Sequence, residues 1–333
     1  MPALIAYCLL GLESHWRPKE KTVTKLITTS FFAITLALTA TTSIQAHESH
    51  QEAGKNDMTN TMSAPDIASE MIAENFYILT GPGGNVGVSA GEDGLYVIDD
   101  KFSRFADQIL FRIREISDEP VRFVLNTHLH GDHSGGNAEM KETGATVFAH
   151  DNVRSRMVSN FEKNTPDTER PAPGDEVWPS LTFSETATLH FNGQTATAHH
   201  VPNAHTDGDS LVVFMPANIV HMGDNYFNGL FPFVDIDSGG NLEGMIAAQD
   251  KVLSMVDDET KIIPGHGPMA TKADLQKSRD ILSDILAQVR TAKDSGMSVE
   301  EVLAAVTLNE YKELSAFIDQ KGMVRQAYRS LEK

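Results

Sequence analysis

Short apolar runs separated by turn-forming residues recur along the chain from about residue 71. Runs of this kind, rich in β-branched and aromatic residues, are typical of β-strands. In chain order, the predicted strands are Phe76–Leu79, Val86–Ser89, Leu95–Ile98, Val121–Leu125, Thr146–Ala149, Leu181–Phe183, Ala187–Phe191, Thr195–Val201, Leu211–Met215, Ile219–Met222 and Lys261–Ile263. We expect Val121–Leu125 to be buried on both faces, as apolar strands of parallel sheets are.

Apolar residues at helical spacing lie between these strands. The first predicted helix contains Phe105, Ile109, Ile113 and Ile116, with Ser103 as its N-cap. Further helices are predicted at Ser134–Glu142, from Asp151 onward, at Asn241–Val256 with Asn241 as the N-cap, and through the C-terminal stretch, where Ile281, Leu282, Ile285, Leu286 and Val289 form an apolar stripe. Two groups of strands with helices between them predict a layered α/β architecture in which helices enclose the sheets.

The chain begins with a pattern of a different kind. The apolar run Leu26–Ala40 follows three lysines, and the small residue Ala46 comes shortly after it. This order is typical of a secretory signal, and the run is short for a membrane span. We therefore expect residues 1–46 to be a cleaved signal peptide and the protein to be periplasmic or secreted. An uncleaved membrane anchor is the alternative.

The remainder divides into two parts. Residues 47–70 are polar and lack periodicity, which predicts a flexible lead-in. Residues 71–333 are few enough for one hydrophobic core, so we predict a single domain whose C-terminal helices begin at about residue 271. The helices of residues 299–331 fit either a cover for an outer sheet face or a dimer contact.

Composition narrows the chemistry. Of the 333 residues, 41% are hydrophobic and 22% charged, the balance of a globular protein, and the formal charge is −19. A chain this acidic would be repelled by a phosphate backbone, so we expect no nucleic-acid partner. We also expect no stable membrane partner after signal cleavage. The single cysteine, Cys8, allows neither a disulfide framework nor a cysteine-based zinc site, so the 13 histidines must carry any transition-metal chemistry.

Three histidines and one aspartate directly follow a predicted buried strand. Residues 127–133 read THLHGDH, which brings three imidazoles and a carboxylate to the end of that strand. A divalent metal would compensate their desolvation. His128 and His130 can point the same way at a two-residue spacing, and Asp132 and His133 can face a second ion.

This sequence resembles the metallo-β-lactamase superfamily, which carries the HxHxDH motif. The resemblance follows the order of elements from about residue 71 to 270 and includes His205 in AHTDGD, Asp224 in HMGD and His266 in PGHGP. It implies an α/β fold, the αββα four-layer sandwich, with extra C-terminal helices. It also implies that residues 71–333 form a metallo-β-lactamase-like hydrolase domain.

The resemblance implies a set of ligands for two divalent ions. His128, His130 and His205 would hold one ion, Asp132, His133 and His266 the other, and Asp224 would bridge them; Asp99 matches the position of a supporting aspartate. Imidazole and carboxylate ligands suit Zn²⁺, and the same ligands accept iron or manganese.

Two such ions support hydrolysis of a small-molecule substrate. The resemblance implies a metal-bound hydroxide, oriented by the catalytic residue Asp132, that attacks a cyclic amide, ester or thioester carbonyl. We expect a β-lactam first, because export favours it. A lactone or thioester is the alternative, because the complete ligand set resembles glyoxalase II-type thioesterases and lactonases. A di-iron redox protein is disfavoured by His130, since that branch has a carboxylate there. An exported metal-binding protein without catalysis is the remaining alternative.

The segment Asn225–Val234 contains four aromatic residues beside Asp224. Tyr226, Phe227 and Phe231 could form the apolar wall of a substrate pocket. Packing in the protein core is the other interpretation.

Overall fold

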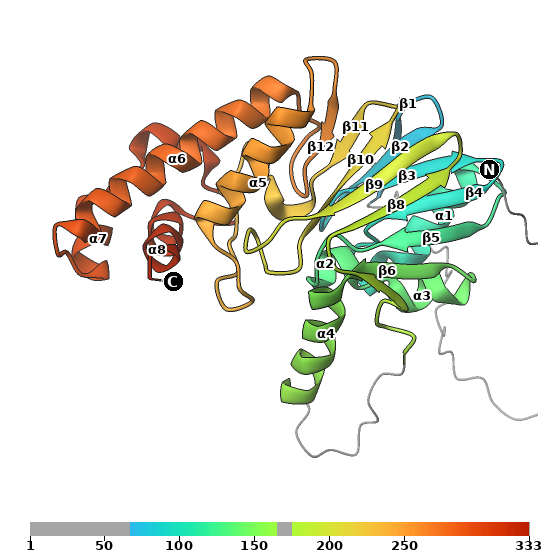
Figure 1. The fold of residues 1–333 in the computed structure, drawn as a ribbon, viewed down its shortest axis with the longest axis horizontal. Helices are drawn as coiled ribbons and strands as arrows, with labels where there is room; N and C mark the ends of the chain where they lie inside the picture. Colours follow the sequence, from blue (N-terminus) through green and yellow to red (C-terminus); the bar gives the residue numbers. More distant parts are fainter. Residues whose placement is uncertain (1–66, 165–174, 333) are drawn as a thin grey trace, which may run out of the picture. The chain divides into compact units, whose positions relative to one another are not determined.

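The computed structural model describes residues 67–164 and 175–332, and its strands form two sheets (Figure 1). The first sheet follows the chain order from β1 to β7. Its strands are β1 (Ala68–Ala73), β2 (Phe76–Thr80), β3 (Val86–Gly91), β4 (Gly94–Ile98), β5 (Val121–Leu125), β6 (Thr146–His150) and β7 (Leu181–Phe183). Strands β1 to β4 are antiparallel neighbours, and β4 to β7 are parallel neighbours.

The second sheet has the order β12-β11-β10-β9-β8. Its strands are β8 (Thr186–Phe191), β9 (Gln194–His200), β10 (Ser210–Met215), β11 (Ile219–His221) and β12 (Lys261–Ile263). Strands β8 to β11 pair antiparallel, whereas β11 and β12 are parallel. The carboxyl ends of β11 and β12 therefore lie side by side.

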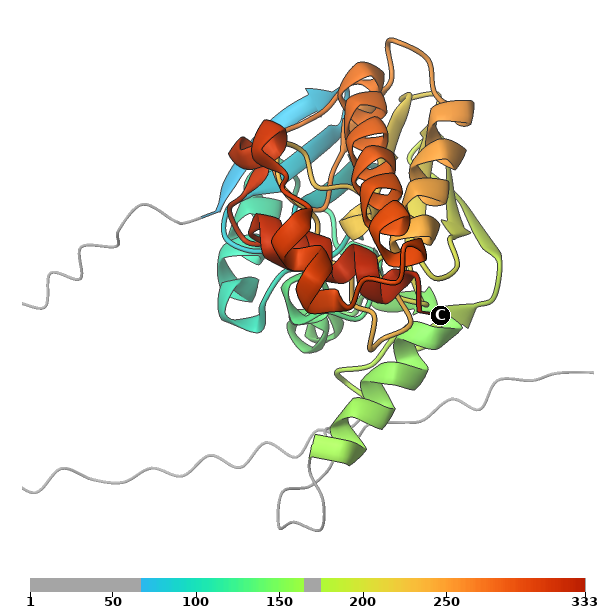
Figure 2. The same ribbon diagram turned by 90° about the vertical axis from the view of Figure 1, so that its left-hand side faces the viewer.

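Helices connect and cover these strands. Before the second sheet they are η1 (Ser103–Phe105), α1 (Ala106–Ile116), α2 (Gly131–Ser134), α3 (Asn137–Glu142) and α4 (Asp151–Asn164). From the end of β11 onward they are η2 (Gly223–Asn225) and α5 (Leu242–Met255), which precede β12, and then α6 (Lys272–Asp294), α7 (Val299–Ala305), η3 (Asn309–Leu314) and α8 (Gln320–Ser330). Figure 2 shows α6, α7 and α8 together, and α8 contacts α5, α6 and α7.

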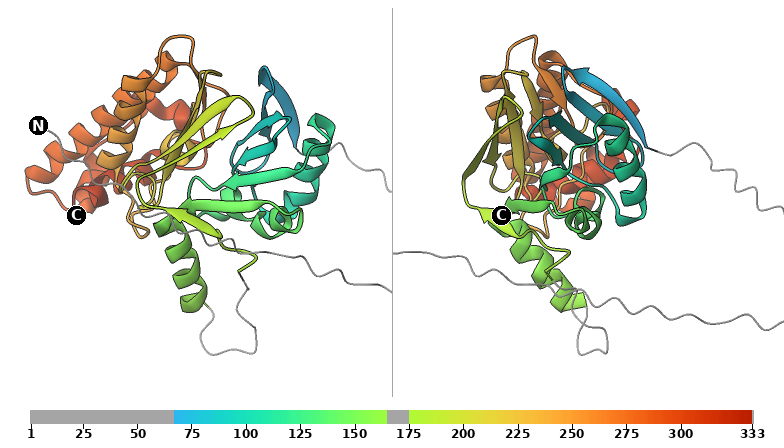
Figure 3. Two further views of the ribbon diagram at one scale, coloured as in Figure 1. Left: turned by 45° about the vertical axis from the view of Figure 1, so that its right-hand side comes forward. Right: turned by 90° about the vertical axis from the view of Figure 1, so that its right-hand side faces the viewer.

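Three apolar clusters join the layers. One side of the first sheet packs on α1 and α3, for example through Val97 and Ile109. The facing sides of the two sheets meet through residues such as Ile98 and Phe214. The other side of the second sheet packs on α5, α6 and α8, with Leu211 in that cluster. Figure 3 shows the resulting order of helix, sheet, sheet and helix, which confirms the predicted αββα sandwich with extra C-terminal helices.

The predicted strands all form, with ends that differ by at most two residues, and one further strand is present among the described residues. Strand β1 includes residues 68–70, which the sequence analysis assigned to the lead-in. Ile67, also assigned to the lead-in, is fully buried. Residues 47–66 and the expected signal peptide lie outside the described residues. In the part of the chain that the structure describes, no helix has the length and apolar character to span a membrane.

Three local predictions were wrong. Ser103 is not an N-cap, because a 3₁₀ turn begins there and its hydroxyl donates to Glu139. The helix predicted at Ser134–Glu142 is interrupted at Gly135, where a Cβ atom would lie 2.4 Å from the carbonyl oxygen of Gly131. Strand β5 is not buried throughout, because Arg122 is exposed. The predicted N-cap Asn241 does accept a hydrogen bond from the backbone N–H of Glu243.

Candidate metal centre

Seven histidine and aspartate side chains meet at one end of the two sheets, all from segments that follow strands. The turn after β5 and helix α2 supply the HxHxDH residues, the loop after β9 supplies His205, η2 after β11 supplies Asp224, and the loop after β12 supplies His266. Strands fix where each loop starts, so donors distant in sequence converge. The structure therefore brings together all seven residues predicted as metal ligands.

One group consists of His128, His130, His205 and Asp224, whose potential ligand atoms all lie within 4.8 Å of one another. His205 Nε2 and His130 Nδ1 are 2.9 Å apart. The Oδ2 atom of Asp224 is 3.7 Å from His128 Nε2 and 3.5 Å from His205 Nε2. All four atoms thus face a common point.

The second group consists of Asp132, His133 and His266, again within 4.8 Å. His266 Nε2 lies 3.3 Å from Asp132 Oδ2 and 3.4 Å from His133 Nε2. The Oδ1 atom of Asp224 lies 3.0 Å from His133 Nε2 and 3.4 Å from His266 Nε2. Asp224 therefore directs one carboxylate oxygen to each group.

The ring nitrogens on the outer side of these histidines have partners of their own. His205 Nδ1 is 2.8 Å from the carbonyl oxygen of Phe233, and His130 Nε2 is 3.0 Å from Asp235 Oδ2. With those nitrogens donating, the inward nitrogens carry lone pairs, which is the form that binds metals. Asp235 was not among the predicted site residues, and nothing in the sequence pattern around it signals this contact.

Asp99 supports both groups from a fully buried position. Its Oδ2 atom is 2.7 Å from His133 Nδ1. The hydroxyl of Thr127 donates to the same oxygen at 2.8 Å and lies 3.1 Å from His128 Nδ1. Asp99 thus holds His133 directly and His128 through Thr127, a contact within the motif that the sequence analysis did not identify.

The electrostatics of this centre suit divalent cations. Burial lowers the pKa of His205 to about 4 and holds that of His128 well below its usual range, so both imidazoles are neutral. The buried Nε2 atom of His128 has no hydrogen-bond partner. Burial raises the pKa of Asp224, but the neighbouring His133 and His266 outweigh it and keep Asp224 ionised. Unpaired nitrogen donors around a carboxylate fit zinc, iron or manganese.

A cavity of about 510 Å³ opens above the two groups. Its floor contains His130, Asp132, Asp224 and His266. The remaining lining residues are Gly83, Phe102, Phe227, Leu230, Phe233 and Phe317. The volume is in the range of small-molecule sites.

The predicted pocket wall needs correction. Phe227 lines this cavity, but Tyr226 and Phe231 are fully buried in the core beneath α5 and α6. Tyr226 donates its hydroxyl to Asn228 Oδ1 instead. Leu230 and Phe233, from the same segment, are the residues that the sequence analysis missed there.

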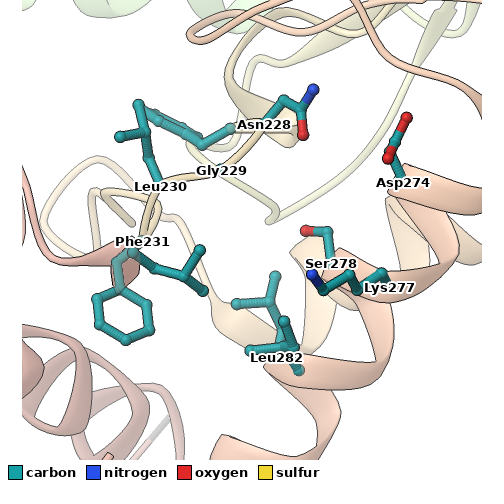
Figure 4. A pocket seen from close by; sticks show the side chains of 11 residues that line it. Asn228, Gly229, Leu230, Phe231, Asp274, Lys277, Ser278 and Leu282 are labelled. Carbon is teal, nitrogen blue, oxygen red and sulfur yellow. The ribbon is translucent and has the colours of Figure 1, made fainter. Parts of the chain in front are cut away.

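A second, smaller cavity of about 100 Å³ lies between residues 228–231 and helix α6 (Figure 4). Asp274, Lys277 and Ser278 line its helical side. It shares only Phe227 and Leu230 with the larger cavity, and none of the seven predicted ligands lines it. Those two side chains therefore form the partition between the two cavities.

Other histidines make structural contacts. His221 is buried beside the carbonyl oxygen of Asn85, at 3.1 Å. His150 lies 2.9 Å from the carbonyl oxygen of Ser184 and stacks on His200. None of them belongs to either of the two groups found among the described residues.

Comparisons with known proteins find a family, sequence relatives and solved structures that this chain resembles. The family model "Metallo-beta-lactamase superfamily" matches residues 79–270, more than half of the chain. Two relatives described as hydroxyacylglutathione hydrolase, from Polaromonas sp. and Pelagibacter ubique, are each 26% identical over 59% and 46% of this chain. The chain spans 66% and 56% of the length of those relatives.

Solved structures show the same fold. The stereoselective inverting sec-alkylsulfatase Pisa1 from Pseudomonas sp. aligns with a TM-score of 0.63 at 17% identity, covering 79% of this chain and 50% of that one. The DIM-1 metallo-beta-lactamase aligns with a TM-score of 0.54 at 18% identity, covering 66% and 98%. At these identities the likeness concerns the fold alone.

Proposed function

The chain belongs to the metallo-beta-lactamase superfamily and is a metal-dependent hydrolase, and from that premise we propose an exported two-metal enzyme that hydrolyses an ester, lactone, thioester or cyclic amide. The observation that carries the proposal is the position of Asp224, which directs Oδ2 to one group and Oδ1 to the other. A structural zinc site is a closed set of four ligands. Seven donors divided by a shared carboxylate, open to a cavity, suit two catalytic ions instead.

His128, His130 and His205 would hold one ion, Asp132, His133 and His266 the second, and Asp224 both. We propose Zn²⁺ as the resident ion, because neutral imidazole and carboxylate are ligands that it accepts. When bound, two such ions would lower the pKa of a water molecule and polarise the substrate carbonyl.

The side chain of Asp132 orients the attacking water. It is 22% exposed, faces the cavity, and has its Oδ2 atom 3.3 Å from His266 Nε2. Burial raises the pKa of Asp132, but the hydrogen bond with His266 and the charge of His133 outweigh it. The carboxylate is therefore ionised near neutral pH and accepts a hydrogen bond from the water through an oxygen.

Acyl transfer to water from an ester or thioester is the favoured reaction. The relatives found by sequence are named hydroxyacylglutathione hydrolase, whereas the β-lactamases match by fold alone.

Export to the periplasm is supported by the pattern of residues 1–46. N-terminal sequencing of the exported protein should find a start near His47; a start that retains residues 26–40 would contradict it.

The test is hydrolysis by the purified, zinc-reconstituted protein of three substrates: a chromogenic cephalosporin, a neutral lactone and an acyl thioester. We expect chelator-sensitive turnover of at least the lactone or the thioester, with kcat/KM of about 10⁴ M⁻¹s⁻¹ or above. His128→Ala is the inactive control. Protein that holds two ions and hydrolyses none of the three would contradict the proposal.

A further inference from the structure

The walls of the metal-site cavity are apolar and rest on the predicted metal ligands. The ring of Phe227 stacks on His266 with centroids 5.0 Å apart. Phe233 lies 6.0 Å from His130 and 5.9 Å from His205, and its carbonyl oxygen holds His205 Nδ1. The walls are therefore fixed relative to the position where the reacting carbonyl must lie.

No lysine or arginine is among the described residues that line this cavity. The two basic residues nearest in sequence to a lining residue, Phe102, have partners of their own. Lys101 is fully buried and donates to the carbonyl oxygen of Gly84. Arg104 lies on the ring of Phe102, 4.1 Å from its centroid. A negative charge on the part of a substrate remote from the metal ions would lose water without gaining a partner.

The rim of the cavity carries an exposed aromatic residue. Phe317 is 75% exposed, the largest exposed fraction among the exposed large apolar side chains of the described residues. Its ring meets that of Phe233 edge to face, with centroids 6.4 Å apart. Phe317 lies between η3 and α8, beyond the segment 79–270 that matches the family model. The C-terminal helices thus add a wall that the matched segment lacks.

We propose that this enzyme selects neutral substrates whose apolar acyl group lies along Phe233 and Phe317. The inference rests on the proposed function and narrows its substrate class. An apolar acyl group would cover the exposed ring of Phe317 and displace water from it, which favours binding. A carboxylate at the same place would be desolvated without a counter-ion.

Two 4-nitrophenyl esters of equal shape test this directly. One is the 6-methylheptanoate, and the other is the monoester of adipic acid, in which a carboxylate replaces the terminal isopropyl group. We expect kcat/KM for the neutral ester to exceed that for the acid by about 100-fold. Equal values, or a preference for the acid that Arg104→Ala abolishes, would overturn the proposal.

Substitutions in the cavity wall test which side chains cause the preference for the neutral ester. Phe317→Ala should raise KM for the neutral ester by about tenfold and leave kcat nearly unchanged, because the contact is remote from the reacting carbonyl. Phe317→Leu should restore most of the loss. Phe111→Ala on α1 removes another exposed phenylalanine, outside the cavity, and should change nothing. A neutral preference that persists unchanged in both Phe317→Ala and Phe233→Ala would contradict the assigned wall.

Binding measurements test the cavity assignment independently of hydrolysis, and so separate it from the proposed function. The anilides of the same two acids react slowly, so calorimetry can measure their affinity for the metal-loaded protein. The neutral anilide should bind at least about tenfold more tightly than the acidic one, and Phe317→Ala should weaken only the neutral anilide. If no ester is hydrolysed but this pattern holds, the proposed function fails and the cavity assignment stands. Equal affinities would overturn the cavity assignment whatever the activity.

Discussion

The floor and the walls of the cavity are built in different ways. The floor consists of charged and imidazole side chains at the ends of strands, and buried partners such as Asp99 hold their outer atoms. The walls are apolar side chains from separate segments, of which Phe317 is largely exposed. Under the proposed function the floor would carry out the hydrolysis, whereas the walls would select the substrate. We therefore expect that mutations can change the reaction and the choice of substrate separately.

The largest effect should follow from removal of the carboxylate shared by the two groups. Asp224→Ala should reduce the bound metal below two ions per chain and lower kcat/KM about 1,000-fold for every substrate, because charge stabilisation in the transition state is lost. Metal analysis and steady-state kinetics measure both effects. Asp237→Ala, which alters an exposed aspartate paired with Arg329, is the matched control. A substrate-dependent loss would contradict the separation of floor from walls.

Asp132→Asn should lower kcat by about 100-fold or more on every substrate, because the amide orients the attacking water less well than the carboxylate. Metal content, measured in parallel, distinguishes this effect from loss of an ion. Full activity with unchanged metal content would remove Asp132 from its proposed role.

Asp99→Asn should weaken metal binding by about 10- to 100-fold, since it loosens His133 directly and His128 through Thr127. Competition with a chromophoric chelator gives the affinity. Asp107→Asn on the exposed side of α1 serves as the control. An unchanged affinity would show that these buried contacts do not position the ligands.

The stability of the metal-free protein should depend on pH. Burial lowers the pKa of His266, but Asp224 and Asp132 outweigh it and raise the pKa to about 9. A raised pKa in the folded state stabilises the protein below the unfolded value near 6.5, and this contribution is lost as pH rises through about 9. The free energy of unfolding of the metal-free protein should fall by about 2 kcal/mol over that interval. Chemical denaturation at several pH values measures it, and His266→Gln, expected to make the fall smaller, is the test variant.

The smallest expected effect is on the preferred length of the acyl chain, and it follows from a change in the partition between the two cavities. Leu230→Ala should join the metal-site cavity to the cavity in Figure 4, because Leu230 lines both. Esters with an acyl chain longer by one or two methylenes should gain about threefold in kcat/KM. A series of 4-nitrophenyl esters measures this preference. No change in preference would show that the two cavities remain separate.

The metal-ligand motif of residues 127–133 was predictable because it directly follows an apolar run that forms a strand. His205, Asp224 and His266 lie in segments that follow other strands, and they were assigned to the centre through the resemblance to the superfamily. The order of layers was predictable for the same reason. Strand β1 was missed because four of its six residues are exposed, so it has no apolar alternation.

The walls were not predictable, because they come from irregular segments. Such segments lack the helix or strand periodicity that would assign a side chain to the protein core or to the cavity. Tyr226 and Phe227 are neighbours, yet one is in the core and the other lines the cavity. Phe317 meets Phe233 only through the packing of the C-terminal helices, 84 residues further along the chain. Such contacts depend on tertiary structure, which local pattern does not encode.

Native mass spectrometry of the zinc-reconstituted protein tests the two-ion floor most directly. The mass of each chain should increase by two zinc ions, and Asp224→Ala should lose at least one of them while keeping its fold. A chain that retains full hydrolytic activity with a single ion would contradict the account.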